Sequence, residues 1–141
     1  FQAEDGIRDV LLSLVGSEMC IRDRIVLPGG LPGADYLRDN KRLQQLMKNH
    51  AAAGKQIGAI CAAPKALAAA GLLEGKSATA YPGVLEALAN EQIDIKSTAI
   101  EIDGNIITSR GPGTAMDFAL TLIELLEGRA KRDEVNRQLV R

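Results

Sequence analysis

Cys61 is the residue whose type and position are best suited to chemistry. It stands where an apolar, strand-like run at 56–60 ends and an Ala-rich, helix-like run opening with Pro64 begins. A side chain on a tight strand-to-helix turn is held clear of the sheet, and the N–H groups that open the helix can lower a thiol pKa or hold an oxyanion. The position therefore favours a nucleophile. The alternative is a buried cysteine that packs as a small hydrophobic side chain.

Four loops are expected to share one rim with this cysteine. They lie at 28–30, at the Cys61 turn itself, at 81–83 and at 109–113. In an open parallel sheet, chemistry gathers in the crevice at the carboxyl ends of the strands. Glycines there let the backbone approach a ligand, and their N–H groups can face a developing oxyanion. Each loop taken singly is typical of an ordinary turn, so the inference depends on the grouping.

The elements that must position these loops alternate between strand and helix from Ile25 onward. Apolar or β-branched runs predict strands at 25–27, 56–60, 77–80, 97–102 and 105–109. Helical periodicity predicts helices at 35–53 and 64–71, a short helix ending at Asn90, a helix from Ala115 to Gly128 and a charged helical tail. This order implies right-handed crossovers and a parallel sheet, and Asp103-Gly104 between two β-branched runs predicts a hairpin. We therefore expect one α/β domain.

Composition excludes several classes of partner. The 141 residues carry 17 basic and 18 acidic side chains, so the chain has no charge footprint for nucleic acid or an anionic membrane. No apolar run approaches transmembrane length, and no signal peptide is visible. The two cysteines, Cys20 and Cys61, give neither a disulfide framework nor a metal-ligand spacing. We therefore expect no metal and a cytoplasmic location.

Residues 1–24 lack the alternating strand and helix pattern of the rest of the chain. Phe1 is not an initiator methionine, and the start of the segment has no coherent helical or strand period. Its end, at 15–24, resembles translated adapter sequence found fused to open reading frames in metagenomic assemblies. We interpret 1–24 as a leader that is not native and 25–141 as a single domain. An ordinary amphipathic N-terminal element is the alternative.

Three motifs together resemble one protein family. Residues 27–30 (LPGG), 59–64 (AICAAP) and 108–114 (TSRGPGT) are similar in order and spacing to the ThiJ/PfpI superfamily, in the branch of the Parkinsonism-associated deglycase and bacterial YajL. The resemblance implies a flavodoxin-like α/β sandwich with a mostly parallel sheet and helices on both faces. It also implies a cofactor-independent protein that is usually a homodimer.

The same resemblance assigns roles to residues of this chain. It implies that Cys61 is the reactive thiol, that the N–H groups of Gly30 and Ala62 form an oxyanion pocket, and that Arg110 and Pro112 line that pocket. The implied substrates are methylglyoxal, a small aldehyde, or its early adducts on glycated protein, with lactate released. Chaperone and peroxide-sensing roles are described for the same family, so a redox sensor or holdase using oxidation of Cys61 is the alternative.

Two positions depart from related patterns. Ala62 follows the cysteine where a protease-like branch has a histidine, which argues against a Cys–His peptidase. Tyr81 precedes Pro82 where a human-type branch has a histidine, so its hydroxyl could donate a hydrogen bond to substrate, although packing at a strand end is the alternative. The only histidine, His50, falls on the apolar stripe of the predicted 35–53 helix, and we expect it to pack half-buried rather than to catalyse.

The resemblance also implies a glutamate that lies beside the thiol and shuttles protons during catalysis. Glu18 follows Gly16 and Ser17 in imitation of the family's Gly-Ser-Glu, but only 43 positions separate it from Cys61. That spacing leaves no room for the first helix and the strands that normally intervene. We therefore expect a truncated family member, without its first strand, helix and glutamate, that is weakly active or inactive.

Overall fold

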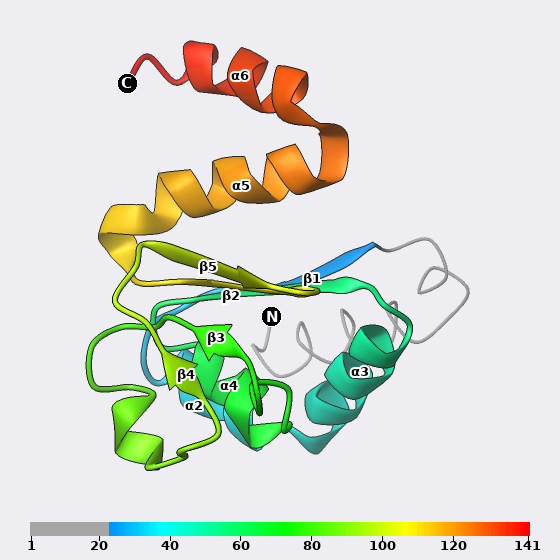
Figure 1. The fold of residues 1–141 in the computed structure, drawn as a ribbon, viewed down its shortest axis with the longest axis vertical. Coiled ribbons are helices and arrows are strands. Elements are labelled where there is room, and N and C mark those ends of the chain that lie inside the picture. Colours follow the sequence, from blue (N-terminus) through cyan, green and yellow to red (C-terminus); the bar gives the residue numbers. More distant parts are fainter. Residues whose placement is uncertain (1–22) are drawn as a thin grey trace, which may run out of the picture.

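In the part of the chain that the structure describes, the main sheet has four strands in the order β1-β2-β6-β5 (Figure 1). The computed structural model describes residues 23–141. It gives β1 as Arg24–Leu27, β2 as Gln56–Ile60, β5 as Ile100–Asp103 and β6 as Ile106–Ser109. Strands β1, β2 and β6 are parallel, and β5 runs antiparallel to β6. The predicted α/β class with a mostly parallel sheet is confirmed.

Helices cover both faces of this sheet. Helices α2 (Gly33–Asp39), α3 (Lys41–Ala52) and α4 (Pro64–Ala69) lie on one face, and α5 (Ala115–Glu127) lies on the other with α6 (Arg129–Gln138) stacked outside it (Figure 1). Small residues in strand β2 allow the helices to pack close to the sheet. A Cβ on Gly58 would lie 3.1 Å from the Phe118 ring of α5, so glycine lets that helix pack close to the sheet. Ile57, on β2, is fully buried in the core on the α3 side.

The helix predicted over 35–53 is two helices. Asn40 interrupts it with an extended backbone, φ −78° and ψ 105°, and its side chain accepts a hydrogen bond from the Leu43 N–H. Asparagine at an N-cap satisfies one of the N–H groups that a helix start leaves unpaired. The prediction of one continuous helix was wrong because the apolar period runs through a residue that caps a new helix.

The strand predicted at 77–80 is shorter and belongs to a different sheet. Strand β3 (Ser77–Ala78) pairs in parallel with β4 (Asp94–Ile95), a strand that the sequence pattern did not predict. The next N–H along, that of Thr79, donates to the Thr108 hydroxyl at 3.0 Å instead of extending a ladder. The short helix expected before Asn90 is a single 3₁₀ turn, η2 (Glu86–Leu88).

The remaining helices and strands are of the predicted type, but they begin and end at somewhat different residues. The hairpin turns at Gly104, with φ 60°, between β5 and β6, and Gly128, with φ 91°, separates α5 from the charged helix α6. Strand β1 begins at Arg24, the last residue of the segment interpreted as a leader, and Glu18 and Cys20 lie outside the described residues. Between residues 23 and 141, no helix is both long and apolar enough to cross a membrane.

Candidate active site

Cys61 occupies the turn between β2 and α4 in a backbone conformation that side chains rarely adopt. Its φ is 65°, in the left-handed region, where a non-glycine residue is strained. Two hydrogen bonds hold the turn: the Cys61 N–H donates to the Ser109 carbonyl at 2.9 Å, and the Tyr81 N–H donates to the Cys61 carbonyl at 2.8 Å. The cysteine is thereby tied to two of the predicted loops, and its side chain is partly exposed.

The loop at 28–30 lies directly against the cysteine. A Cβ on Gly29 would be 2.6 Å from the Cys61 Cβ, 2.9 Å from the Ile60 carbonyl oxygen and 3.4 Å from the Cys61 sulfur. Glycine is therefore required at this contact, because any side chain would collide with backbone as well as with the cysteine. The structure brings the first and second predicted loops together.

The two N–H groups assigned to an oxyanion pocket stand in turns on either side of this contact. Gly30 has φ 95°, and its carbonyl accepts from the Ala34 N–H at 2.9 Å, which anchors the loop to α2. Ala62 follows the cysteine and is buried. Among the described residues, no protein group accepts a hydrogen bond from the N–H of Gly30 or of Ala62. Neither donor is used within residues 23–141.

The loop at 109–113 completes the rim beside Tyr81. Tyr81 is 51% exposed, and a Cβ on Gly111 would meet its ring at 3.4 Å, so ring and loop are in contact. The Arg110 N–H donates to the Ala99 carbonyl at 3.0 Å, and exposed Pro112 opens the 3₁₀ turn η3 (Pro112–Thr114). Tyr81 thus links the Cys61 turn to the loop that contains Arg110 and Pro112.

Buried and half-buried hydroxyl groups, to which the sequence assigned no role, support this cluster. The Thr79 hydroxyl donates to the Thr98 carbonyl at 2.8 Å, while Thr108 accepts from the Thr79 N–H. The Ser109 and Thr114 hydroxyls lie 2.7 Å apart, and the Thr114 hydroxyl also accepts from the Gly111 N–H at 3.1 Å. Thr108, Ser109 and Thr114 belong to the 108–114 motif of the sequence, whereas Thr79 looks there like an ordinary β-branched strand residue and carries no signal.

No carboxylate of residues 23–141 hydrogen-bonds the Cys61 thiol. The same residues contain no group of three or more histidine, cysteine, aspartate or glutamate side chains able to hold a metal ion. The loops that meet at Cys61 therefore carry a thiol, two backbone donors and the Tyr81 phenol, and Arg110 follows Ser109 in one of them. That set can form a covalent bond to a carbonyl carbon and hold the oxygen, but it brings no acid or base to the thiol.

His50 is far from this chemistry. It lies on α3 and is 2% exposed, more deeply buried than expected. It neighbours Asp23 and Gln56, at the start of β1 and β2, whereas Cys61 follows the end of β2. Burial lowers the pKa of His50, and the Lys55 ammonium lowers it further. Backbone hydrogen bonds with Asp23 and Gln56 have the opposite, smaller effect and raise the pKa. The expectation of a packing role is consistent with this position.

Cys61 thus lies on a tight turn between a strand and a helix of a mostly parallel α/β sheet. The chain matches the DJ-1/PfpI family over residues 10–125, a range that includes part of the segment interpreted as a leader. The chain therefore belongs to the DJ-1/PfpI family.

Curated relatives and solved structures agree with this assignment. Protein DJ-1 homolog A of Arabidopsis thaliana is 47% identical over 131 residues, covering 92% of this chain and 33% of the relative. Protein dj-1beta of Drosophila melanogaster is 41% identical over 132 residues, covering 94% and 70%. The crystal structure of the fly protein superposes with a TM-score of 0.85 at 39% identity, over 92% of this chain and 68% of that one. This chain thus spans about a third of the plant relative's length and about two thirds of the fly protein's.

Proposed function

We propose that this chain is a cofactor-independent enzyme of the glyoxalase or deglycase type that uses Cys61 as its nucleophile. The proposed substrates are methylglyoxal and its early adducts on glycated protein. The observation that carries the proposal is the strained Cys61 turn, with φ 65°, which packs against Gly29. The N–H groups of Gly30 and Ala62 flank this turn and donate to no group of residues 23–141. Strain at one non-glycine residue inside such a donor cluster is typical of an active site.

The chemistry follows from these groups. The Cys61 thiolate attacks the aldehyde carbon, forming a carbon–sulfur bond, and the carbonyl π electrons move to the oxygen. The N–H groups of Gly30 and Ala62 donate hydrogen bonds to that oxygen, and protonation gives the hemithioacetal. A proton then leaves the former aldehyde carbon while the neighbouring carbonyl oxygen gains one, which gives an enediol. The enediol is protonated at the second carbon and loses the proton of the first hydroxyl, which produces a thioester. Water hydrolyses the thioester to lactate and returns the thiol.

Proton transfer is the step with least support from the described residues. General acid–base catalysis by a positioned side chain contributes roughly 10²-fold to 10⁴-fold to a rate. Among residues 23–141 no carboxylate is bonded to the thiol. We therefore propose that this chain turns over aldehyde slowly, with solvent or buffer carrying the proton.

Chemical rescue tests both parts of this proposal. Lactate formation from methylglyoxal is measured with the full chain at rising concentrations of formate or acetate, at constant pH and ionic strength, after subtraction of the protein-free rate. We expect slow turnover that increases with carboxylate concentration, because a small carboxylate can replace a missing base. Turnover that is fast and indifferent to buffer would show that a protein base is present. No lactate at any concentration would reject the enzymatic function.

A redox-sensor or holdase function is the second candidate. Cys61 is partly exposed, and one similar solved structure, at TM-score 0.80 and 36% identity, is described as oxidised Toxoplasma gondii DJ-1. Oxidation of the thiolate to sulfinate would place acceptor oxygens among the same N–H donors. Peroxide titration with intact-mass detection separates the two functions. Stoichiometric oxidation of Cys61 without lactate formation supports the sensor, and resistance of Cys61 to peroxide excludes it.

The partners of the intact protein also remain proposals. We propose a homodimer in the cytoplasm, with a small aldehyde or a glycated protein as the substrate. Sedimentation equilibrium of the full chain measures the first point, since a dimer has twice the monomer mass of 15.0 kDa. A single species at the monomer mass over a wide concentration range would reject dimerisation for this chain.

A further inference from the structure

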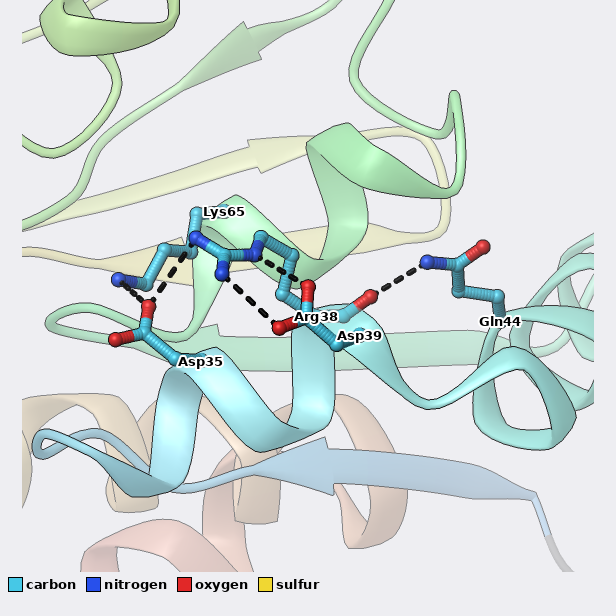
Figure 2. A network of polar contacts seen from close by, with 5 residues as sticks. All are labelled: Asp35, Arg38, Asp39, Gln44 and Lys65. Atoms are coloured by element: carbon cyan, nitrogen blue, oxygen red, sulfur yellow. Dashed lines mark hydrogen bonds and ion pairs between the residues drawn. The ribbon is translucent and has the colours of Figure 1, made fainter.

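A cluster of ion pairs joins the helix that follows the 28–30 loop to the helix that follows Cys61 (Figure 2). Asp35, in the first turn of α2, forms an ion pair with Lys65, in the first turn of α4. Arg38, one turn further along α2, pairs with the same Asp35 oxygen at 3.3 Å. Asp35 therefore holds two cations, one on its own helix and one across the interface between α2 and α4.

The Asp35–Lys65 pair differs from an ordinary surface ion pair in its burial. The Lys65 side chain is only 13% exposed and that of Asp35 is 36% exposed, whereas Asp39, which pairs with Arg38 at 2.8 Å, is 66% exposed. Exposed pairs contribute about 0–1 kcal/mol to stability. A largely buried ammonium that loses the carboxylate with which it forms an ion pair is far more costly. Lys65 therefore constrains where α2 can lie.

The two helices begin next to the two loops that meet at the thiol. Helix α2 starts three residues after Gly30, whose carbonyl accepts from the Ala34 N–H at 2.9 Å, and α4 starts three residues after Cys61. The other end of α2 is held as well, because the Gln44 side chain of α3 donates to the Arg38 carbonyl at 2.5 Å (Figure 2). The ion pair thus bridges the bases of both loops, and α2 has little freedom to pivot.

We propose that Asp35 and Lys65 are positioning residues whose ion pair holds the 28–30 loop against Cys61. The pair sets the separation between the thiol and the Gly30 N–H, so that the oxyanion donor is in place before the aldehyde binds. This inference rests on the proposed function for its catalytic consequence. The placement of the loop is a separate, measurable property of the same pair.

The experiment compares variants that remove the buried pair with a matched control. Asp35→Asn removes the counter-charge, and Lys65→Gln removes the same pair from the other side if the first variant folds poorly. Lys65→Arg keeps the charge and should rescue. Asp39→Asn is the control, because it removes a carboxylate that pairs with the same Arg38 and acts on Lys65 through its charge alone, without an ion pair to α4. All variants carry Cys20→Ser, so that Cys61 is the only thiol.

Two readouts are needed. The first is kcat and KM for lactate formation from methylglyoxal, and the second is the rate at which Cys61 reacts with the bulky disulfide DTNB. For Asp35→Asn and Lys65→Gln we expect kcat to fall about tenfold with little change in KM, since a misplaced donor acts in the transition state. We also expect a faster DTNB reaction, because the loop no longer shields the sulfur. Lys65→Arg and Asp39→Asn should stay within about twofold of the parent in both readouts.

Three other results would show whether the Asp35–Lys65 pair positions the loop. If Asp35→Asn and Lys65→Gln lower only the melting temperature, with kcat and the DTNB rate unchanged, the pair is merely structural and the inference is wrong. If Asp39→Asn changes both readouts as much as Asp35→Asn, the effect is not specific to the α2–α4 bridge, and the inference is again wrong. If the parent chain makes no lactate, the proposed function fails and the DTNB rates alone decide whether the pair positions the loop.

Discussion

Gly29 packs so closely on Cys61 that a Cβ at position 29 would lie 2.6 Å from the cysteine Cβ. The contact joins the loop after β1 to the turn after β2, two segments about thirty residues apart in the chain. It is the closest link between the thiol and the loop that carries the Gly30 N–H. The first prediction concerns this contact.

Gly29→Ala should disturb both stability and activity. The new methyl group would overlap the Cys61 Cβ and lie 2.9 Å from the Ile60 carbonyl, so the loop must move. Overpacking of this kind costs about 1–3 kcal/mol, to be measured by urea denaturation. Gly33→Ala is the control, because a Cβ there meets nothing within 4 Å. Equal stability of the two variants would contradict the contact.

Backbone strain at Cys61 can be measured with two substitutions that both remove the thiol. Glycine adopts a positive φ without penalty, whereas alanine keeps the strain that φ 65° imposes. Cys61→Gly should therefore be more stable than Cys61→Ala by about 1 kcal/mol, the reverse of the order expected in a regular helix or strand. The free energy of unfolding in urea checks this. Greater stability of the alanine variant would mean that the turn is unstrained.

The hydroxyl network beneath the loops should be sensitive to Thr108→Val. Valine keeps the shape but leaves the buried Thr79 N–H without its acceptor, which lies at 3.0 Å in the structure. An unsatisfied buried donor costs about 1–3 kcal/mol. Thr98→Val, at an exposed side chain whose hydroxyl bonds Glu101, should change stability by less than about 0.5 kcal/mol. A loss confined to Thr98→Val would contradict this account of the network.

His50 should make the protein less stable in mild acid. Burial, reinforced by Lys55, lowers the pKa of His50 below its ordinary value of 6.5, so in the pH range just below 6.5 the unfolded chain binds a proton that the folded chain does not. The contribution of His50 to the free energy of unfolding is complete above pH 6.5 and decreases as the pH drops below that value. The decrease ends once the pH is below the lowered pKa of His50 in the folded chain. His50→Gln, which removes the only histidine, should flatten that part of the curve. An unchanged slope in the variant would assign the pH dependence elsewhere.

The sequence predicted the position of the thiol because that prediction depends on local patterns. An apolar run, a cysteine and Pro64 mark a strand-to-helix turn, and glycine-rich loops at the ends of parallel strands must share one rim. The contacts of Cys61 with Gly29, Ser109 and Tyr81 agree with that reasoning. The fold class followed from the same alternation of strand and helix.

The features that the sequence did not predict depend on single side chains, which the periodic pattern of apolar residues does not reveal. Asn40 caps a helix within a continuous apolar period, so its effect on the chain direction is invisible to periodicity. Strand β4 has two exposed residues and no strand signal. Thr79 and Lys65 matter through partners 29 and 30 residues away, Thr108 and Asp35, and such pairings emerge only when the elements pack.

The most direct test of the central claim is lactate formation from methylglyoxal by matched thiol variants. Cys61→Ser and Cys20→Ser are assayed beside the parent chain at equal folded concentration, at the formate or acetate concentration that gives the highest parent rate. We predict that Cys20→Ser retains the parent rate and that Cys61→Ser falls to the protein-free rate, because a serine hydroxyl without a base is a poor nucleophile. Turnover that survives Cys61→Ser would contradict the assignment of Cys61 as the nucleophile.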